Sequence, residues 1–260
     1  MRQRIITGVI AAAIFVPLVL VGGLPFTLLV YLLATVGVFE LLKMRKISLL
    51  SFPTFMSILL IWTFLLSQTN ASLANTIFNH KVEVVLLAVL LLLTYTVLIK
   101  NRFTFDDAGF VILATIYIGM GFYYFIAIRE EQLSYVFLAL FVTWASDSGA
   151  YFIGKSMGKR KLWPDISPNK TIEGSVGGIV CGVIVALLFA FLSPLTESPL
   201  HLMVIGLVLS IFGQVGDLVE SAFKRHYGVK DSGNILPGHG GVLDRTDSWL
   251  FVFPILYFLI

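Results

Sequence analysis

Charge in this chain is concentrated in one stretch, which reads GDLVESAFKR from Gly216 to Arg225 and, further on, GHGGVLDRTD from Gly238 to Asp247. Residues 216–247 hold five of the fifteen carboxylates and four of the eighteen Lys and Arg residues. If the first part is a helix, its polar side chains at i, i+3, i+4 and i+7 share one face, and these are Asp217, Glu220, Ser221 and Lys224. Carboxylates beside a cation on one face suit a divalent metal next to an anionic phosphate.

The second part of the stretch adds a glycine-rich loop and two further carboxylates. Gly240 and Gly241 follow His239 and allow backbone N–H groups to approach an anion closely. Asp244 and Asp247 bring hard oxygen ligands of the kind that Mg2+ binds. The alternative is an interfacial loop whose charges simply pair with one another, because structural ion pairs can resemble a site.

The order of residues from Ser221 to Asp247 resembles the signature of a known enzyme family. It reads Ser-x-Phe-Lys-Arg-x4-Lys-Asp-x-Gly-x2-Leu-Pro-x-His-Gly-Gly-Val-x-Asp-Arg-Thr-Asp and is similar over all 27 positions to the phosphatidate cytidylyltransferases, the CDP-diacylglycerol synthases. The resemblance implies a nucleotidyltransferase that uses CTP, phosphatidate and Mg2+. It also implies Asp217 and Asp244 as metal ligands, with Asp147 and Asp247 completing or supporting the metal shell.

The rest of the chain is strongly apolar, since 58% of its 260 residues are hydrophobic and only 13% are charged. This composition excludes a soluble globular domain. Apolar runs of about 18 residues can cross roughly 30 Å of hydrocarbon. We therefore expect an all-α integral membrane protein, a polytopic bundle of about nine transmembrane helices with a polar active site on the cytoplasmic side. The candidate spans are 5–22, 25–42, 49–67, 83–99, 108–128, 134–153, 172–193, 200–223 and 248–260.

The two ends of this series differ from an ordinary span. The apolar run after Arg2 and Arg4 continues through Leu20 without a clear cleavage site, so we expect a retained spanning helix rather than a signal peptide. The last candidate, 248–260, has 13 residues and is about 20 Å long as a helix. We expect it either to end inside the bilayer or to continue beyond the given chain.

Basic residues are distributed unevenly among the connections between spans. Sixteen Lys and Arg residues fall on one side, and only Lys81 and Arg129 fall on the other. By the positive-inside rule the basic side faces the cytoplasm, which predicts a multi-pass protein of the cell membrane with its active site facing the cytoplasm. Residues 1–130 then form N-terminal transmembrane helices, and residues 131–260 form a catalytic membrane region with cytoplasmic loops at 154–171 and 224–247.

One acid lies far from the charged stretch, inside a membrane-like run. Asp147 is a functional candidate because a carboxylate in such a run is costly, and pairing with a lysine of a neighbouring helix is the alternative. The spacing Trp144-x2-Asp147-x2-Ala150-Tyr151 resembles a second stretch of the same family. Residues 149–156 also fit the phosphate-loop pattern G-x4-G-K-[ST], but the bulky interior Ala-Tyr-Phe-Ile at a membrane-helix end cannot form such a loop.

The start of the seventh span combines a helix cap with a basic residue. Thr171 can cap the helix, which places Lys170 beside its positive end, where phosphate groups bind. Similar segments occur in the family that the charged stretch resembles, so Asn169 and Lys170 are candidate nucleotide contacts. Within the span, small residues at i, i+4 and i+8 predict close approach of another helix, and these are Gly174, Gly178 and Gly182.

A membrane enzyme that transfers a cytidylyl group from CTP to phosphatidic acid is the function that these features favour. The catalytic candidates are Asp217, Asp244, Lys224, Arg225, Lys230, Asp231, His239, Arg245 and Asp247. The candidate binding residues are Asn169, Lys170, Gly240, Gly241 and Asp147. His239 is expected to donate a hydrogen bond to phosphate rather than to act as a strong base.

Two other functions stay open at this point. A CTP-dependent kinase of a lipid alcohol would share the membrane setting but would transfer the γ-phosphate. A transporter would place its charges near the bilayer midplane and often show inverted repeats, and the sequence has neither feature. The expected partners are CTP, phosphatidic acid and membrane lipids, with a homodimer left open and no nucleic acid.

Overall fold

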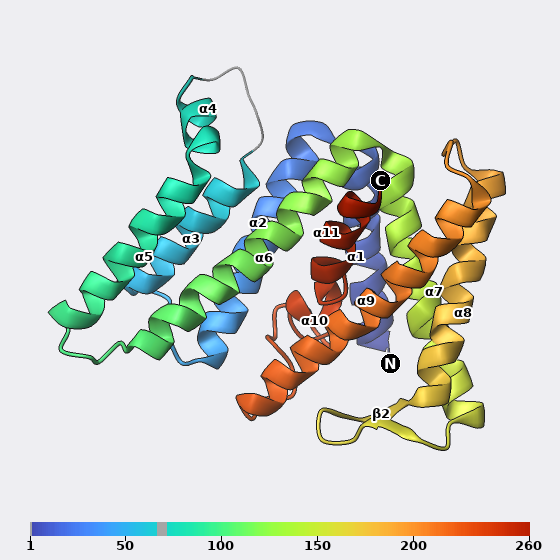
Figure 1. Ribbon diagram of the computed structural model, residues 1–260. Helices are drawn as coiled ribbons and strands as arrows, with labels where there is room; N and C mark the ends of the chain where they lie inside the picture. The colour runs from blue at the N-terminus through green and yellow to red at the C-terminus, as the bar shows by residue number, and fades with distance from the viewer. Residues whose placement is uncertain (1, 67–71) are drawn as a thin grey trace.

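The computed structural model of the protein describes residues 2–66 and 72–260 and is almost entirely helical (Figure 1). Its elements are α1 (Arg2–Val21), α2 (Gly23–Met44), α3 (Phe52–Leu65), α4 (Ser72–Asn79), α5 (Lys81–Leu98), α6 (Phe105–Glu131), α7 (Leu133–Met157), β1 (Lys161–Trp163), β2 (Ser167–Thr171), α8 (Ile172–Leu192), α9 (Pro199–His226), α10 (Leu243–Thr246) and α11 (Trp249–Leu259). The side chains of Arg2 and Arg4, and residue 67 at the predicted end of the third span, lie outside the described residues.

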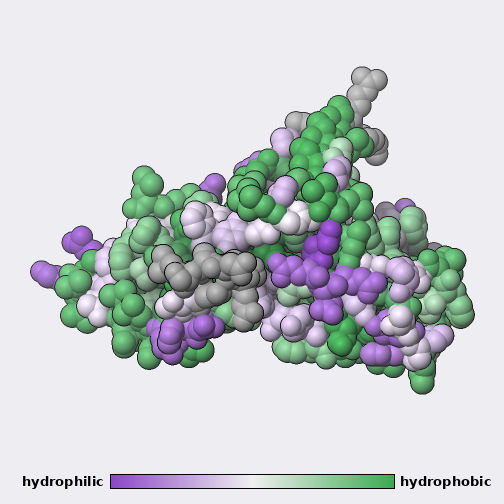
Figure 2. Space-filling view, turned by 90° about the horizontal axis from the view of Figure 1, so that it is seen from above, coloured by the Kyte–Doolittle hydropathy of each residue, from purple (hydrophilic) through white to green (hydrophobic). Residues whose placement is uncertain are grey.

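Within the described residues, six helices are long and apolar enough to cross a membrane by length and composition, and they are α2, α5, α6, α7, α8 and α9. Among the other helices at predicted spans, α1 contributes the shorter apolar segment Ile6–Val21, α3 has 14 residues and α11 has 11. A helical, multi-pass architecture is thus confirmed, whereas the count of nine spans stays a prediction. Figure 2 shows hydrophobic residues along most of the molecular rim, with hydrophilic residues in separate patches on the face turned to the viewer.

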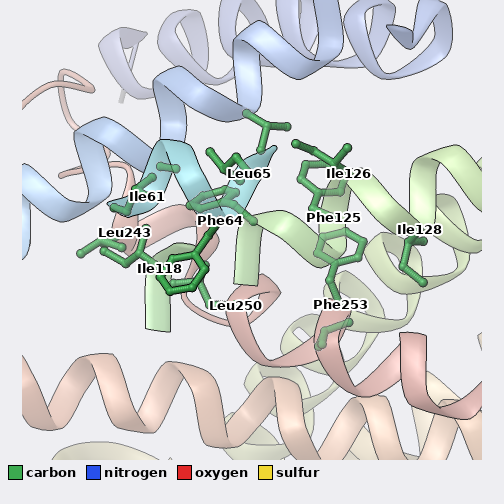
Figure 3. Packing of buried hydrophobic residues seen from close by; sticks show 14 of the residues in the cluster. Ile61, Phe64, Leu65, Ile118, Phe125, Ile126, Ile128, Leu243, Leu250 and Phe253 are labelled. Carbon is green, nitrogen blue, oxygen red and sulfur yellow. The ribbon is translucent and has the colours of Figure 1, made fainter. Parts of the chain in front are cut away.

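Helix α6 is the central element of the hydrophobic core and packs against α2, α3 and α11. It begins with a capping box, in which Thr104 and Asp107 exchange side-chain and backbone hydrogen bonds. Farther along α6, Phe125 stacks on Phe253 of α11 with ring centroids 4.3 Å apart (Figure 3). Gly121 directly faces Leu250 of α11, so the absence of a side chain there allows the two helices to pack closely.

Helices α7, α8 and α9 form a second group that packs through glycines. A Cβ at Gly174 or Gly178 of α8 would meet the backbone of α7, and one at Gly182 would meet Ser210 of α9. The predicted close approach along this span is confirmed, and α7 and α8 lie side by side in Figure 1. Thr171 caps α8 as predicted, because its hydroxyl accepts a hydrogen bond from the Gly174 N–H at 3.1 Å.

The connection between α7 and α8 and the loop between α9 and α10 lie at the same end of the molecule as the N-terminus, hereafter the polar end (Figure 1). The region predicted as the loop 154–171 contains a short antiparallel hairpin, in which β1 pairs with β2 through Lys161 and Thr171. Sequence reasoning did not predict these strands, because Lys-Leu-Trp and Ser-Pro-Asn-Lys-Thr are too short for an alternating pattern to be evident. Arg225 at the end of α9 donates a hydrogen bond to the Ile166 carbonyl at 3.3 Å and so joins the hairpin to the charged stretch.

Candidate active site

A cavity of about 420 Å³ lies between α7, β2, α8 and α9 at the polar end. Four predicted site residues line it together, and they are Asp147, Asn169, Lys170 and Asp217. The Lys170 ammonium forms an ion pair with the Asp217 carboxylate, and both side chains are partly exposed. Residues from three separate parts of the chain therefore meet in one cavity, hereafter the acidic cavity, as a shared site requires.

The wall of the acidic cavity contains a hydrogen-bonded polar group that sequence reasoning missed. The amide nitrogen of Gln214 donates to the Ser146 hydroxyl and to the Ser175 carbonyl, each at 3.2 Å. Ser175 donates its hydroxyl to the Gln214 amide oxygen at 2.5 Å. The available signal was Gln214 itself, a polar residue in an apolar span only three positions before Asp217.

The two carboxylates of the acidic cavity are ligands of the kind that a hard cation binds, although they are too few to fill its coordination shell. Within residues 2–66 and 72–260, no group of three or more His, Cys, Asp or Glu residues is arranged to hold a metal ion. Asp147 and Asp217 nevertheless line the same cavity, together with the oxygen donors of Asn169 and Gln214. Mg2+ commonly uses one or two carboxylates and completes its shell with water and substrate phosphates, and this donor set fits that pattern.

Lys224 of α9 lies between two buried carboxylates. Its ammonium is 2.6 Å from Glu220 on the same helix and 2.7 Å from Oδ1 of Asp244 on α10. The Glu220 side chain is only 2% exposed, so its charge depends on this pairing. The triad of Glu220, Lys224 and Asp244 fixes α10 against the last turn of α9, and both Lys224 and Asp244 were predicted site residues.

The second oxygen of Asp244 is also occupied. Oδ2 accepts hydrogen bonds from the Ser232 N–H at 2.8 Å, the Ser232 hydroxyl at 2.9 Å and the Gly241 N–H at 2.8 Å. Burial raises the pKa of Asp244, but the hydrogen bonds from Lys224, Gly241 and Ser232 outweigh burial and lower it to about 2. In this structure the Gly241 N–H therefore holds Asp244, and the metal role predicted for Asp244 stays a prediction.

Asp247 follows α10, and its carboxylate is affected by charges from both groups described above: Asp147 and Asp217 of the acidic cavity, and Lys224 of the triad. Burial and repulsion from Asp217 and Asp147 raise its pKa, while a hydrogen bond from the Ser248 N–H at 2.7 Å acts in the opposite direction. A bound cation would relieve this repulsion, because an opposite charge favours the ionised carboxylate. The supporting role that the resemblance implies for Asp247 stays a prediction.

A second cavity, of about 590 Å³, lies in the loop between α9 and α10. Five predicted residues line it, and they are Lys230, Asp231, His239, Gly240 and Arg245. Gly238 and Gly240 have φ angles of 76° and 84°, a region that favours glycine. Arg245 donates a hydrogen bond to the His239 carbonyl at 2.9 Å, and among the described residues the buried Nδ1 of His239 has no hydrogen-bond partner. We call this cavity the basic cavity.

The predicted residues are thus divided between two cavities and the Lys224–Asp244 ion pair rather than gathered in one pocket. The acidic cavity and the basic cavity receive four and five of them, and Lys224 and Asp244 pair with each other. Arg225 lines neither cavity and is exposed at the end of α9. One further acid was not predicted: Glu40 of α2, whose carboxylate accepts hydrogen bonds from the Val242 and Leu243 N–H groups.

Comparisons with known proteins extend the resemblance over the whole chain. The model of the cytidylyltransferase family matches residues 2–260. A protein of Bacillus subtilis (strain 168) named phosphatidate cytidylyltransferase is 60% identical over 264 residues, which cover 100% of this chain and 97% of the relative. Proteins of the same name from Staphylococcus haemolyticus (strain JCSC1435) and Staphylococcus aureus (strain COL) are 48% and 45% identical, and in both the match covers 100% of this chain and 99% of the relative.

These matches include residues 2–130, where the sequence alone had indicated only an apolar bundle. They agree with the 27-residue signature, several of whose charged residues line the second cavity. The predicted family is confirmed: the chain belongs to the cytidylyltransferase family.

Proposed function

We propose that this protein is a phosphatidate cytidylyltransferase, an integral membrane enzyme that transfers CMP from CTP to phosphatidic acid and releases pyrophosphate. Relatives of that name, aligned over the whole chain, support the proposal. The observation that carries it is the meeting of Asp147, Lys170 and Asp217 in one cavity, with Lys230 and Arg245 in a second cavity. Two cavities lined by charged side chains suit a reaction between two anionic phosphates.

In the proposed reaction, an oxygen of the lipid phosphate attacks the α-phosphorus of CTP. The bond between the α-phosphorus and the bridging oxygen breaks, and the electron pair leaves with pyrophosphate. A phosphate monoester has a second pKa of about 6 and is already anionic near neutral pH, so the attack needs no strong base. The protein must instead position two anions and neutralise the charge that builds on the leaving group.

The basic cavity has the groups that such neutralisation needs. Lys230 and Arg245 supply cations, and the imidazole of His239 lines the same cavity. At the acidic cavity, Lys170 is placed next to Asp217, and Asn169 adds an amide. We assign the nucleotide contacts predicted for Asn169 and Lys170 to the acidic cavity.

Mg2+ is the cofactor that we assign to the acidic cavity. Asp217 and Asp147 would hold it, and the ion would supply positive charge next to the triphosphate. Asp244 is the second ligand that the family resemblance implies. Because its Oδ1 pairs with Lys224 and its Oδ2 accepts three hydrogen bonds, Asp244 would have to release one of these partners to bind a metal.

An isotope experiment separates the proposed reaction from a lipid kinase. Purified protein with phosphatidate, Mg2+ and CTP labelled at the α-phosphate is expected to give labelled lipid, whereas CTP labelled at the γ-phosphate is expected to give labelled pyrophosphate. The reason is that attack at the α-phosphorus keeps the α label on the lipid. Lipid labelled only from the γ position would contradict the proposal in favour of a kinase, and no label transfer to any lipid would favour a transporter.

We also propose that both cavities face the cytoplasm, as the basic asymmetry of the chain indicates. In a Cys181→Ser background, Pro164→Cys and His226→Cys place thiols at two exposed positions of the polar end, and Thr196→Cys places one in the exposed α8–α9 connection. The first two are expected to react with a membrane-impermeant thiol reagent only from the cytoplasmic side, and Thr196→Cys only from outside. The reverse pattern would overturn the orientation and leave CTP without access.

A further inference from the structure

Glu40 is a buried acid that connects the N-terminal half of the chain to the charged stretch. It lies in the last part of α2 and is only 4% exposed. Its Oε1 accepts a hydrogen bond from the Val242 N–H at 2.8 Å, and its Oε2 accepts one from the Leu243 N–H at 2.9 Å. Oε2 also lies 3.0 Å from the Ser232 hydroxyl, whose single proton is shared between Glu40 and Asp244. One carboxylate therefore holds both the start of α10 and the loop that precedes it.

Ser232 extends this connection to the predicted site. Its hydroxyl lies 3.0 Å from Glu40 and 2.9 Å from Oδ2 of Asp244, and its N–H donates to the same Asp244 oxygen at 2.8 Å. Asp244 is the second residue of α10, two positions after Val242. Any shift of the α10 start relative to Glu40 therefore moves Asp244 and, with it, the Asp244–Lys224 pair.

The loop is also shaped to admit the Glu40 side chain. The three atoms that a Cβ at Gly233 would meet first all belong to Glu40, and a Cβ at Gly241 would likewise overlap the Glu40 carboxylate. Beside these contacts, the buried Leu243 side chain packs against Gly37, one turn before Glu40 on α2. Apolar packing and hydrogen bonding thus act on the same short segment.

We propose that Glu40 is a positioning residue for catalysis, which fixes α10 and thereby the Asp244–Lys224 pair in the geometry that the reaction needs. The inference rests on the proposed cytidylyltransferase function. Glu40 does not line either cavity and is not expected to touch a substrate. Its loss should therefore lower kcat while leaving the KM values for CTP and phosphatidate nearly unchanged.

The first test compares substitutions of Glu40 with a control on the same helix. A small misplacement of catalytic groups can cost about a hundredfold in rate, so Glu40→Ala is expected to lower kcat about 100-fold and Glu40→Gln about tenfold, with KM values within about threefold of wild type. Glu40→Gln keeps one acceptor oxygen but turns an NH2 group toward an N–H donor. The control Thr35→Val removes a hydrogen bond between α2 and Trp62 of α3, five residues before Glu40, and should keep wild-type kcat.

The second test uses Gly233, where the three heavy atoms nearest to an added Cβ all belong to Glu40. In the wild-type background, the methyl group of Gly233→Ala should displace the Glu40 carboxylate. The loop would then shift, and kcat should fall about tenfold. In the Glu40→Ala background the added methyl group has room, so the double variant should be no slower than Glu40→Ala alone. Independent losses that multiply in the double variant would overturn the proposal, as would a kcat for Glu40→Gln within threefold of wild type in folded protein.

A readout without substrate separates this inference from the proposed function. Lys230 is exposed in the loop that Glu40 holds, so trypsin should cut the detergent-solubilised Glu40→Gln and Glu40→Ala proteins there faster than wild type or Thr35→Val. If wild type forms no CDP-diacylglycerol but this difference in cleavage is found, the assigned reaction fails and the link between Glu40 and the loop stands. Equal cleavage of all four proteins would refute the link itself.

Discussion

Replacing Asp217 by Asn is expected to lower kcat at least about 1,000-fold while the protein stays folded and inserted. Asp217 lines the acidic cavity and contacts Lys170, and it is the residue that we assign as the principal Mg2+ ligand. A metal ion can contribute several kcal/mol to transition-state stabilisation, and about 4 kcal/mol corresponds to about a 1,000-fold change in rate. The side chain of Asn has nearly the same size, so the loss would report charge rather than packing.

The measurement is kcat over a range of Mg2+ concentrations at saturating CTP and phosphatidate. Asp217→Asn should require more Mg2+ for half-maximal activity, because one anionic ligand is missing. The matched control is Asp165→Asn, which removes an exposed carboxylate from the connection between β1 and β2 and should leave activity and Mg2+ dependence unchanged. Activity of Asp217→Asn within threefold of wild type would show that the carboxylate is structural.

The sequence predicted the members of the site better than their pairings. Asp147, Lys170 and Asp217 were named from a membrane-embedded acid, a helix cap and a charged helix face, and they do meet in one cavity. Asp244 and Lys224 were also named, but their direct pairing at 2.7 Å was not. A motif specifies which residues are present, whereas the pairing depends on how α10 lies against α9.

Glu40 illustrates a further limit of reasoning from one sequence. A single acid near the end of an apolar span is compatible with a side chain that simply reaches the interface, and nothing near Glu40 in the chain indicates its partners at Val242 and Leu243. The sequence features that belong together lie far apart in the chain, with the acid in α2 and its partners in the charged stretch. The glycines that make room for Glu40, Gly233 and Gly241, lie in the charged stretch, where Gly241 was predicted only as a phosphate contact and Gly233 only as part of the family signature.

The predicted helix boundaries were less accurate than the predicted helices themselves, for a different reason. Apolar runs predicted every long helix, but they do not mark where a helix starts. The third span was predicted from residue 49, whereas α3 begins at Phe52 because Ser48, Ser51 and Thr54 form a hydrogen-bonded turn with Pro53 at the helix start. Local polar contacts of this kind shorten a helix without changing the hydrophobic pattern that predicts it.

Asp244→Asn is expected to lower kcat by about 100- to 1,000-fold, because this residue positions charged groups that the reaction needs. An amide has one acceptor oxygen, so Asn cannot hold Lys224 on one side and the Ser232 and Gly241 N–H groups on the other. Lys224 would still pair with Glu220, so a buried cation is not left alone and the protein should stay folded. Activity within threefold of wild type would make the Asp244 contacts purely structural.

The Mg2+ dependence of Asp244→Asn then decides how Asp244 acts. If Asp244 binds the metal, as the family resemblance implies, half-maximal activity should move to higher Mg2+ as in Asp217→Asn. If Asp244 acts through Lys224, the Mg2+ requirement should stay at its wild-type value and Lys224→Met should reproduce the loss. Lys224→Met alone would leave buried Glu220 unpaired, which costs about 3–5 kcal/mol of folding stability. The variant to compare is therefore the double variant Lys224→Met with Glu220→Gln, which removes the lysine and the Glu220 charge together. An inactive double variant with unchanged thermal stability would assign the effect to Lys224 in the reaction rather than to folding.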